Sequence, residues 1–282
     1  MAWFERDGCR IHYEVVGDEG PWIVLTPGGR GSLEDVRYLA LACADKGYRV
    51  LLHDRRNCGK SDVYVAGGLS EQEIWADDVH ALLTELEALP VIAGGGSAGC
   101  RLSLLLAIRY PGAVAGLLLW WVTGGRHAAE YLGEQYYGQF IDMARAGGMA
   151  AVCKSDFFSE RIRDNPGNRE RLLGMDPKTF INTMRQWQQF FLAGADLPVI
   201  GASREQLASI GVPTCIVPGS DEVHPRAIAV SLSEILPASE LHYPFAREET
   251  AQIRVLPVEE IMALFRERLA GIFTGYLART RF

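Results

Sequence analysis

The chain has 282 residues, of which 48% are hydrophobic and 22% charged, and its formal net charge is -7 at pH 7. A chain of this length can bury a core that needs no disulfide or metal. The negative net charge and the absence of a block of like charges argue against a nucleic-acid partner, whose phosphates require a basic face.

The first 124 residues alternate between short apolar runs and amphipathic stretches. In chain order, strands are predicted at 11–16, 22–25, 48–53, 91–93 and 117–122. Helices are predicted between them at 33–46, 74–89 and 98–110. Continuous apolar strands separated by helices are typical of a parallel sheet that is covered on both faces.

The pattern changes after residue 124. Residues 125–209 contain helical stretches, such as 131–146 and 179–192, and no clear strand. Strands at 214–217 and 240–243 and helices at 227–236 and 258–277 then restore the alternation. We therefore predict an α/β core formed by residues 1–124 and 210–282, with a helical insertion at 125–209.

A glycine-rich turn carries the first candidate for chemistry. Gly95-Gly96-Ser97-Ala98-Gly99 fits G-x-S-x-G and lies between a predicted strand and a predicted helix, which is the context of a nucleophile elbow. The helix N-terminus behind such a serine favours a developing negative charge. The alternative is a turn with a structural serine, but the flanking elements and the motifs below favour a nucleophile.

Four segments in this order resemble the α/β-hydrolase superfamily. They are Pro27-Gly28-Gly29-Arg30-Gly31, similar to H-G-G-P-G; residues 54–62, similar to D-x-R-G-x-G-x-S-D; the serine turn; and residues 218–225, similar to G-x-D-x-x-H-P. The resemblance implies a doubly wound, mostly parallel eight-stranded sheet, with the helical insertion as a cap over the cleft. Within the superfamily, the chain is most similar to hydrolases of esters or of C–C bonds beside a ketone.

The resemblance also implies an oxyanion hole made by the backbone N–H groups of Gly29 and Ala98. Pro27 replaces a histidine that many relatives have, and that histidine mostly shapes the loop. Arg30, beside this loop, is a candidate to bind a substrate carboxylate through its guanidinium group. It could equally pair with Glu34 or be a solvated loop residue.

Asp221 follows the strand at 214–217, where the family carries the acid that orients its catalytic histidine. The alternative is a turn aspartate that caps the helix beginning at Pro225. Relatives often read E-L-H-V-I-P-G-x-G-H after the last strand, and the final histidine is catalytic. This chain begins the same way, but no histidine follows His242.

A serine needs a nearby base to become nucleophilic. His224 lies in the loop after Asp221, so we predict that it is this base; the alternative is that it only begins a helix with Pro225. Asp221 would orient the ring, or Glu249 could do so from the last loop. His127 opens the insertion and is a second histidine that could reach the cleft.

Aromatic residues are abundant in the insertion, and plain helix packing explains most of them. Trp120 and Trp121 lie at the carboxyl end of a predicted strand, where ligands bind in open α/β sheets. We expect one of them to face the pocket and predict Trp121 as a substrate-binding residue. An aromatic cleft favours an apolar or aromatic substrate.

The predicted function is cofactor-free cleavage of an ester, lactone or activated C–C bond in a small apolar or aromatic molecule through Ser97. The alternatives are a cofactor-free lyase or oxygenase with a histidine base, and a ligand-binding relative without activity. A homodimer is compatible with the sequence.

Cysteine usage and hydropathy bear on the surroundings of the protein. The six cysteines include no C-x-x-C pair, which excludes common zinc motifs and favours a reducing compartment. The first residues lack an apolar signal core, and the longest apolar stretch, 113–123, is too short for a membrane span. We therefore expect a cytoplasmic protein with no bound metal and no membrane or nucleic-acid partner.

Overall fold

The computed structural model describes residues 2–246, 248–249, 253, 255–280 and 282. These residues contain an eight-stranded sheet with the strand order β1-β2-β4-β3-β5-β6-β7-β8. The strands are β1 (Ala2–Arg6), β2 (Cys9–Val16), β3 (Trp22–Thr26), β4 (Arg49–His53), β5 (Val91–Gly96), β6 (Val114–Trp120), β7 (Thr214–Val217) and β8 (Ser239–Leu241). The β1–β2 and β2–β4 pairs are antiparallel and the other pairs are parallel. The predicted mostly parallel sheet is confirmed.

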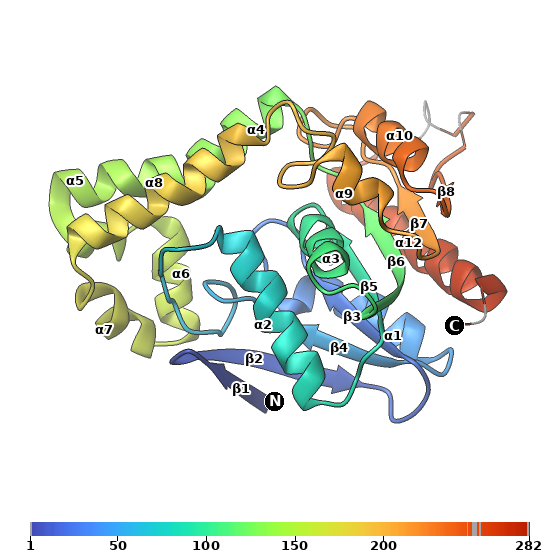
Figure 1. Ribbon diagram of the computed structural model, residues 1–282, viewed down its shortest axis with the longest axis horizontal. Helices are drawn as coiled ribbons and strands as arrows, with labels where there is room; N and C mark the ends of the chain where they lie inside the picture. Colours follow the sequence, from blue (N-terminus) through green and yellow to red (C-terminus); the bar gives the residue numbers. More distant parts are fainter. Residues whose placement is uncertain (1, 247, 250–252, 254, 281) are drawn as a thin grey trace.

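Helices cover both faces of this sheet, with α2 and α3 in front of it and α12 behind it in the view of Figure 1. One face carries α2 (Glu71–Glu85), α3 (Ala98–Arg109), α9 (Arg204–Ala208) and α10 (Arg226–Ile235). The other carries η1 (Leu33–Val36), α1 (Arg37–Ala44) and α12 (Val258–Thr280).

The strands are continuously apolar because helices cover both faces of the sheet. Along β3, Val24 faces one buried cluster while Ile23 and Leu25 face the other. Successive side chains of a strand point to opposite faces, so a strand buried on both sides must be apolar at every position.

The remaining helices lie to one side of the sheet (Figure 1). They are α4 (Arg126–Gly133), the π turn η2 (Glu134–Gly138), α5 (Gln139–Val152), α6 (Asp156–Asp164), α7 (Gly167–Leu173) and α8 (Pro177–Ala193). Their aromatic and aliphatic side chains form a third buried cluster, which also includes Val63. We call the segment from α4 to α8 the cap. The short helix α9 packs against α3 and α10 instead, so the end of the predicted insertion lies with the sheet.

The structure differs from the sequence prediction at several elements. Strand β1 was not predicted; it pairs with β2 at the edge of the sheet. The helix predicted over 33–46 is a 3₁₀ turn followed by α1. Helix α2 begins at Glu71, earlier than predicted, because Ser70 and Glu73 form a capping box. The Ser70 hydroxyl accepts a hydrogen bond from the Glu73 N–H, and the Glu73 carboxylate accepts one from the Ser70 N–H.

Among the described residues, no helix is both long and apolar enough to cross a bilayer.

Candidate active site

Ser97 lies on a strained turn between β5 and α3. Its φ of 53° is in the left-handed region, which non-glycine residues rarely adopt. The glycines on either side allow the close approach: a methyl group on Gly95 would lie 2.2 Å from the Gly99 carbonyl, and one on Gly99 would lie 2.2 Å from the Thr26 oxygen. The turn therefore requires small residues at both positions, and it leaves the Ser97 side chain at the carboxyl edge of the sheet.

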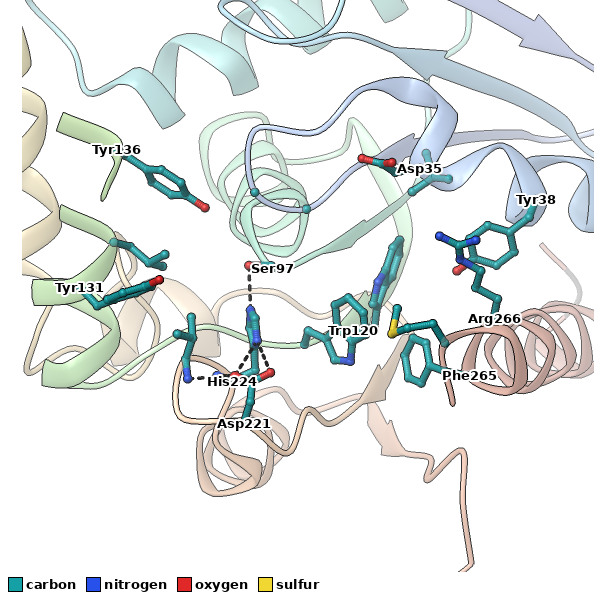
Figure 2. Close-up of a pocket in the computed structure, with 17 residues that line it drawn as sticks. Asp35, Tyr38, Ser97, Trp120, Tyr131, Tyr136, Asp221, His224, Phe265 and Arg266 are labelled. Carbon is teal, nitrogen blue, oxygen red and sulfur yellow. Dashed lines mark hydrogen bonds and ion pairs between the residues drawn. The ribbon is translucent and has the colours of Figure 1, made fainter. Parts of the chain in front are cut away.

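The structure brings Ser97, His224 and Asp221 together, as Figure 2 shows. Ser97 Oγ lies 2.8 Å from His224 Nε2. On the other side of the ring, His224 Nδ1 lies 3.0 Å and 2.9 Å from the two carboxylate oxygens of Asp221. All three contacts have hydrogen-bond length.

The loop between β7 and α10 supplies both partners of Ser97. The Asp221 carboxylate also accepts hydrogen bonds from the backbone N–H groups of Val223 and His224, at 2.9 Å and 2.8 Å. A methyl group on Gly219 would lie 2.4 Å from His224 Cβ, so only glycine permits this tight turn.

Hydrogen bonding fixes the charge of Asp221. Partial burial alone would raise its pKa, but the hydrogen bonds from the ring and the backbone of His224 lower it below the ordinary value of 3.8. An ionised carboxylate selects the tautomer with a proton on Nδ1, which leaves Nε2 of His224 free to accept the Ser97 hydroxyl proton.

Two backbone amides lie beside the serine. Ala98 is the first residue of α3, and Gly29, with φ of 48°, lies in the loop after β3. The loop is close to Ser97, because a methyl group on Gly28 would lie 3.5 Å from Ser97 Cβ. Within the part of the chain that the structure describes, neither the Gly29 nor the Ala98 N–H has a hydrogen-bond partner.

A cavity of about 540 Å³ opens at these groups. Aromatic residues form much of its wall: Tyr38, Trp120, Trp121, Tyr131, Tyr136 and Phe265. Both tryptophans line it, and the Trp121 ring stacks on Phe265 at 4.8 Å and lies 6.0 Å from the His224 ring. The predicted substrate-binding position of Trp121 therefore faces the cavity.

The comparisons agree with this architecture. Residues 21–146 match the family model described as alpha/beta hydrolase fold. The chain has the α/β-hydrolase fold.

Similar proteins carry hydrolase names. The chain is 35% identical over 104 residues to a Bacillus subtilis (strain 168) protein named "Uncharacterized hydrolase YraK", a match that covers 37% of this chain and spans 38% of that protein. It is 23% identical over 264 residues to a proline iminopeptidase of Lacticaseibacillus rhamnosus (strain Lc 705), covering 83% and 86% of the two chains. The enol-lactonase of Burkholderia xenovorans LB400 superposes with a TM-score of 0.62 at 20% identity, covering 97% of this chain and 100% of that one.

Arg30 does not face the cavity as a free cation, which is what a substrate-binding role would require. Its side chain is only 6% exposed, and its guanidinium nitrogens bond the Glu71 carboxylate at 2.7 Å and 3.1 Å. Glu34 pairs with Arg37 instead. Burial alone would lower the pKa of Arg30, but the charge of Glu71 raises it. This geometry does not support a role for Arg30 in binding a substrate carboxylate, because its guanidinium group is buried and already bonded to the carboxylate of Glu71.

The alternative groups for the base and its acid also have other partners. The Glu249 carboxylate bonds Arg268 at 3.2 Å and the Ala246 amide at 2.9 Å, so it does not orient His224. His127 lies 3.6 Å from Glu222 on the exposed surface. Glu248, the neighbouring carboxylate in the same loop, forms no hydrogen bond or ion pair with the residues that the structure describes.

Three residues near the site were not singled out from the sequence. Thr123 Oγ1 lies 3.3 Å from Ser97 Oγ, and Arg55 Nη2 donates to the carbonyl oxygens of Gly28 and Gly29, at 3.3 Å and 3.0 Å. Tyr136 of the cap lines the cavity. The position of Thr123 just after a strand is a signal that could have found it, whereas the other two contacts depend on tertiary packing.

Proposed function

We propose that this protein is a serine hydrolase that cleaves an ester, lactone or activated C–C bond in a small apolar or aromatic molecule. The observation that carries the proposal is the 2.8 Å contact between Ser97 Oγ and His224 Nε2, backed by Asp221 on the far side of the ring. A serine becomes a nucleophile when a base accepts its proton.

The reaction follows from these positions. Ser97 Oγ attacks the carbonyl carbon as its proton moves to His224 Nε2, and Asp221 stabilises the imidazolium that forms. The carbonyl oxygen gains the negative charge and accepts hydrogen bonds from the amides of Gly29 and Ala98. The imidazolium then gives its proton to the leaving group, and an acyl group remains on Ser97. A water molecule, deprotonated by His224, attacks the acyl carbon and releases the acid and the free serine.

The cavity supports the proposed substrate class. Its aromatic walls favour an apolar or aromatic group. The similarity to a protein named as a hydrolase and to a proline iminopeptidase supports hydrolysis as the reaction type.

Ser97→Ala tests the proposal directly. The purified protein is assayed on p-nitrophenyl esters, lactones and a vinylogous diketone, and labelled with a fluorophosphonate. Loss of the serine should abolish labelling and lower kcat by a factor on the order of 10⁶. Ser159→Ala, which removes an exposed hydroxyl on α6, is the matched control and should keep full activity. Activity that persists in Ser97→Ala would contradict the proposal and favour a lyase or oxygenase in which a histidine acts alone.

A further inference from the structure

Tyr136 is a cap residue whose hydroxyl reaches the oxyanion loop. It belongs to the π turn η2 between α4 and α5, and such turns often occur at functional sites. A methyl group built on Gly29 would lie 3.7 Å from the Tyr136 hydroxyl. Figure 2 shows this hydroxyl pointing into the cavity toward Ser97.

Packing holds the Tyr136 ring in this direction. The ring makes an edge contact with Phe191 at 5.9 Å, and the Arg30 guanidinium lies 5.2 Å from its centre. Arg30 also donates to the Tyr136 carbonyl oxygen at 3.3 Å and is itself held by Glu71. Arg30, the predicted substrate-binding residue, thus joins the cap to the core through its contacts with Tyr136 and Glu71.

The Tyr136 hydroxyl differs from that of its neighbour. The Tyr137 hydroxyl is buried and donates to the Glu71 carboxylate at 3.0 Å. Among the residues that the structure describes, none forms a hydrogen bond with the Tyr136 hydroxyl. A rigid donor that faces a cavity without a protein partner is available to a ligand in that cavity.

We infer that Tyr136 is a catalytic residue: its O–H is a third donor to the oxyanion, beside the amides of Gly29 and Ala98. This inference rests on the proposed serine hydrolysis. The hydroxyl donates a hydrogen bond to the carbonyl oxygen as that oxygen gains charge, and the proton stays on the phenol. The oxyanion site is then complete only when the cap is in place, which links the position of the cap to the chemical step.

Tyr136→Phe tests the inference because it removes the hydroxyl and keeps the ring. Removing one oxyanion donor should lower kcat by a factor on the order of 10² with little change in KM. The affinity for a boronic acid that forms a tetrahedral adduct with Ser97 should fall in parallel. Tyr13→Phe makes the same chemical change on β2, outside the cavity, and should leave both quantities unchanged.

A second variant covers the case in which Tyr136→Phe folds poorly. Incorporation of 3,5-difluorotyrosine at position 136 keeps the O–H and moves its pKa toward neutrality, so kcat should fall as pH rises through the new phenol pKa. A structural role of the ring would produce no such limb in the pH profile.

The outcomes separate this inference from the function on which it rests. Unchanged kcat and boronate affinity in Tyr136→Phe, in a protein whose activity requires Ser97, would overturn the inference alone. A rise in KM at constant kcat would also overturn it, because the hydroxyl would then act in ground-state binding. A wild-type protein with neither esterase activity nor fluorophosphonate labelling would overturn both.

Discussion

The loops that follow β7 and β8 differ in what they bring to the site. The loop after β7 carries both Asp221 and His224, three residues apart, and both reach toward Ser97. After β8, where the family resemblance would put the histidine, His242 bonds Glu240 and Glu249 bonds Arg268. One loop thus supplies two groups that, by that resemblance, would come from two loops.

The proposed chemistry therefore depends on where the reacting atoms lie at the sheet edge and not on which loop carries them. Strands β6, β7 and β8 run parallel, so the loops that follow them leave the sheet at the same edge. The Asx-type turn at Asp221 curls the chain back, which lets a side chain three residues later face the serine. We therefore expect activity to require the loop after β7 and not the loop after β8.

The largest expected effect separates the two histidines. His224→Gln should lower kcat by a factor on the order of 10⁶, as loss of the histidine base does in a serine protease. His242→Gln, the matched change in the other loop, should keep wild-type kcat/KM on the same ester. Equal losses in both variants would remove the distinction between the loops, and a loss confined to His242→Gln would reverse it.

A smaller effect separates the two carboxylates. Asp221→Asn should lower kcat by a factor on the order of 10⁴, because a neutral amide no longer selects the tautomer with Nδ1 protonated. Glu249→Gln weakens an exposed ion pair, so it should cost about 0.5 kcal/mol of unfolding free energy and leave kcat unchanged. Steady-state kinetics measures kcat of the two variants, and thermal unfolding measures their stability. A kcat in Glu249→Gln as low as that in Asp221→Asn would contradict the assigned difference between the two carboxylates.

The smallest change that we expect is a rise in the pKa of Asp221 when the His224 ring is removed. Partial burial favours its neutral form, but hydrogen bonds from His224 hold the pKa below the ordinary value of 3.8. The Asp221–His224 interaction is therefore fully present above pH 3.8, and its contribution to stability is lost as pH falls through the lowered pKa. Carboxyl ¹³C NMR should show the Asp221 pKa rising in His224→Gln. An identical titration in the two proteins would mean that the ring does not stabilise the carboxylate.

The sequence predicted most of the fold because burial on both faces makes strands uniformly apolar. Residues 214–217, for example, are the strand β7 as predicted. Strand β5 was harder to delimit, since Gly94 to Gly96 continue its pairing with β6 where the sequence suggests only a turn. The edge strand β1 is half exposed and gives a weaker signal.

The sequence indicated those groups of the candidate site that are close along the chain or that lie in segments resembling the α/β-hydrolase superfamily. The short spacing of Asp221 and His224 lies within one turn, so sequence could suggest their contact. The Arg30–Glu71 pair spans 41 positions and joins two elements whose approach only packing determines. Tyr136 is one of many aromatic residues in the cap. The direction of its side chain depends on a π turn that the sequence pattern did not predict.

The most direct test of the central claim is a crystal structure of the protein after phosphonylation of Ser97. We expect a phosphoryl oxygen about 3 Å from the amide nitrogens of Gly29 and Ala98, with His224 Nε2 within hydrogen-bond distance of the adduct and Asp221 behind the ring. An adduct whose oxygen points away from both amides, or a site in which another residue takes the place of His224, would contradict it.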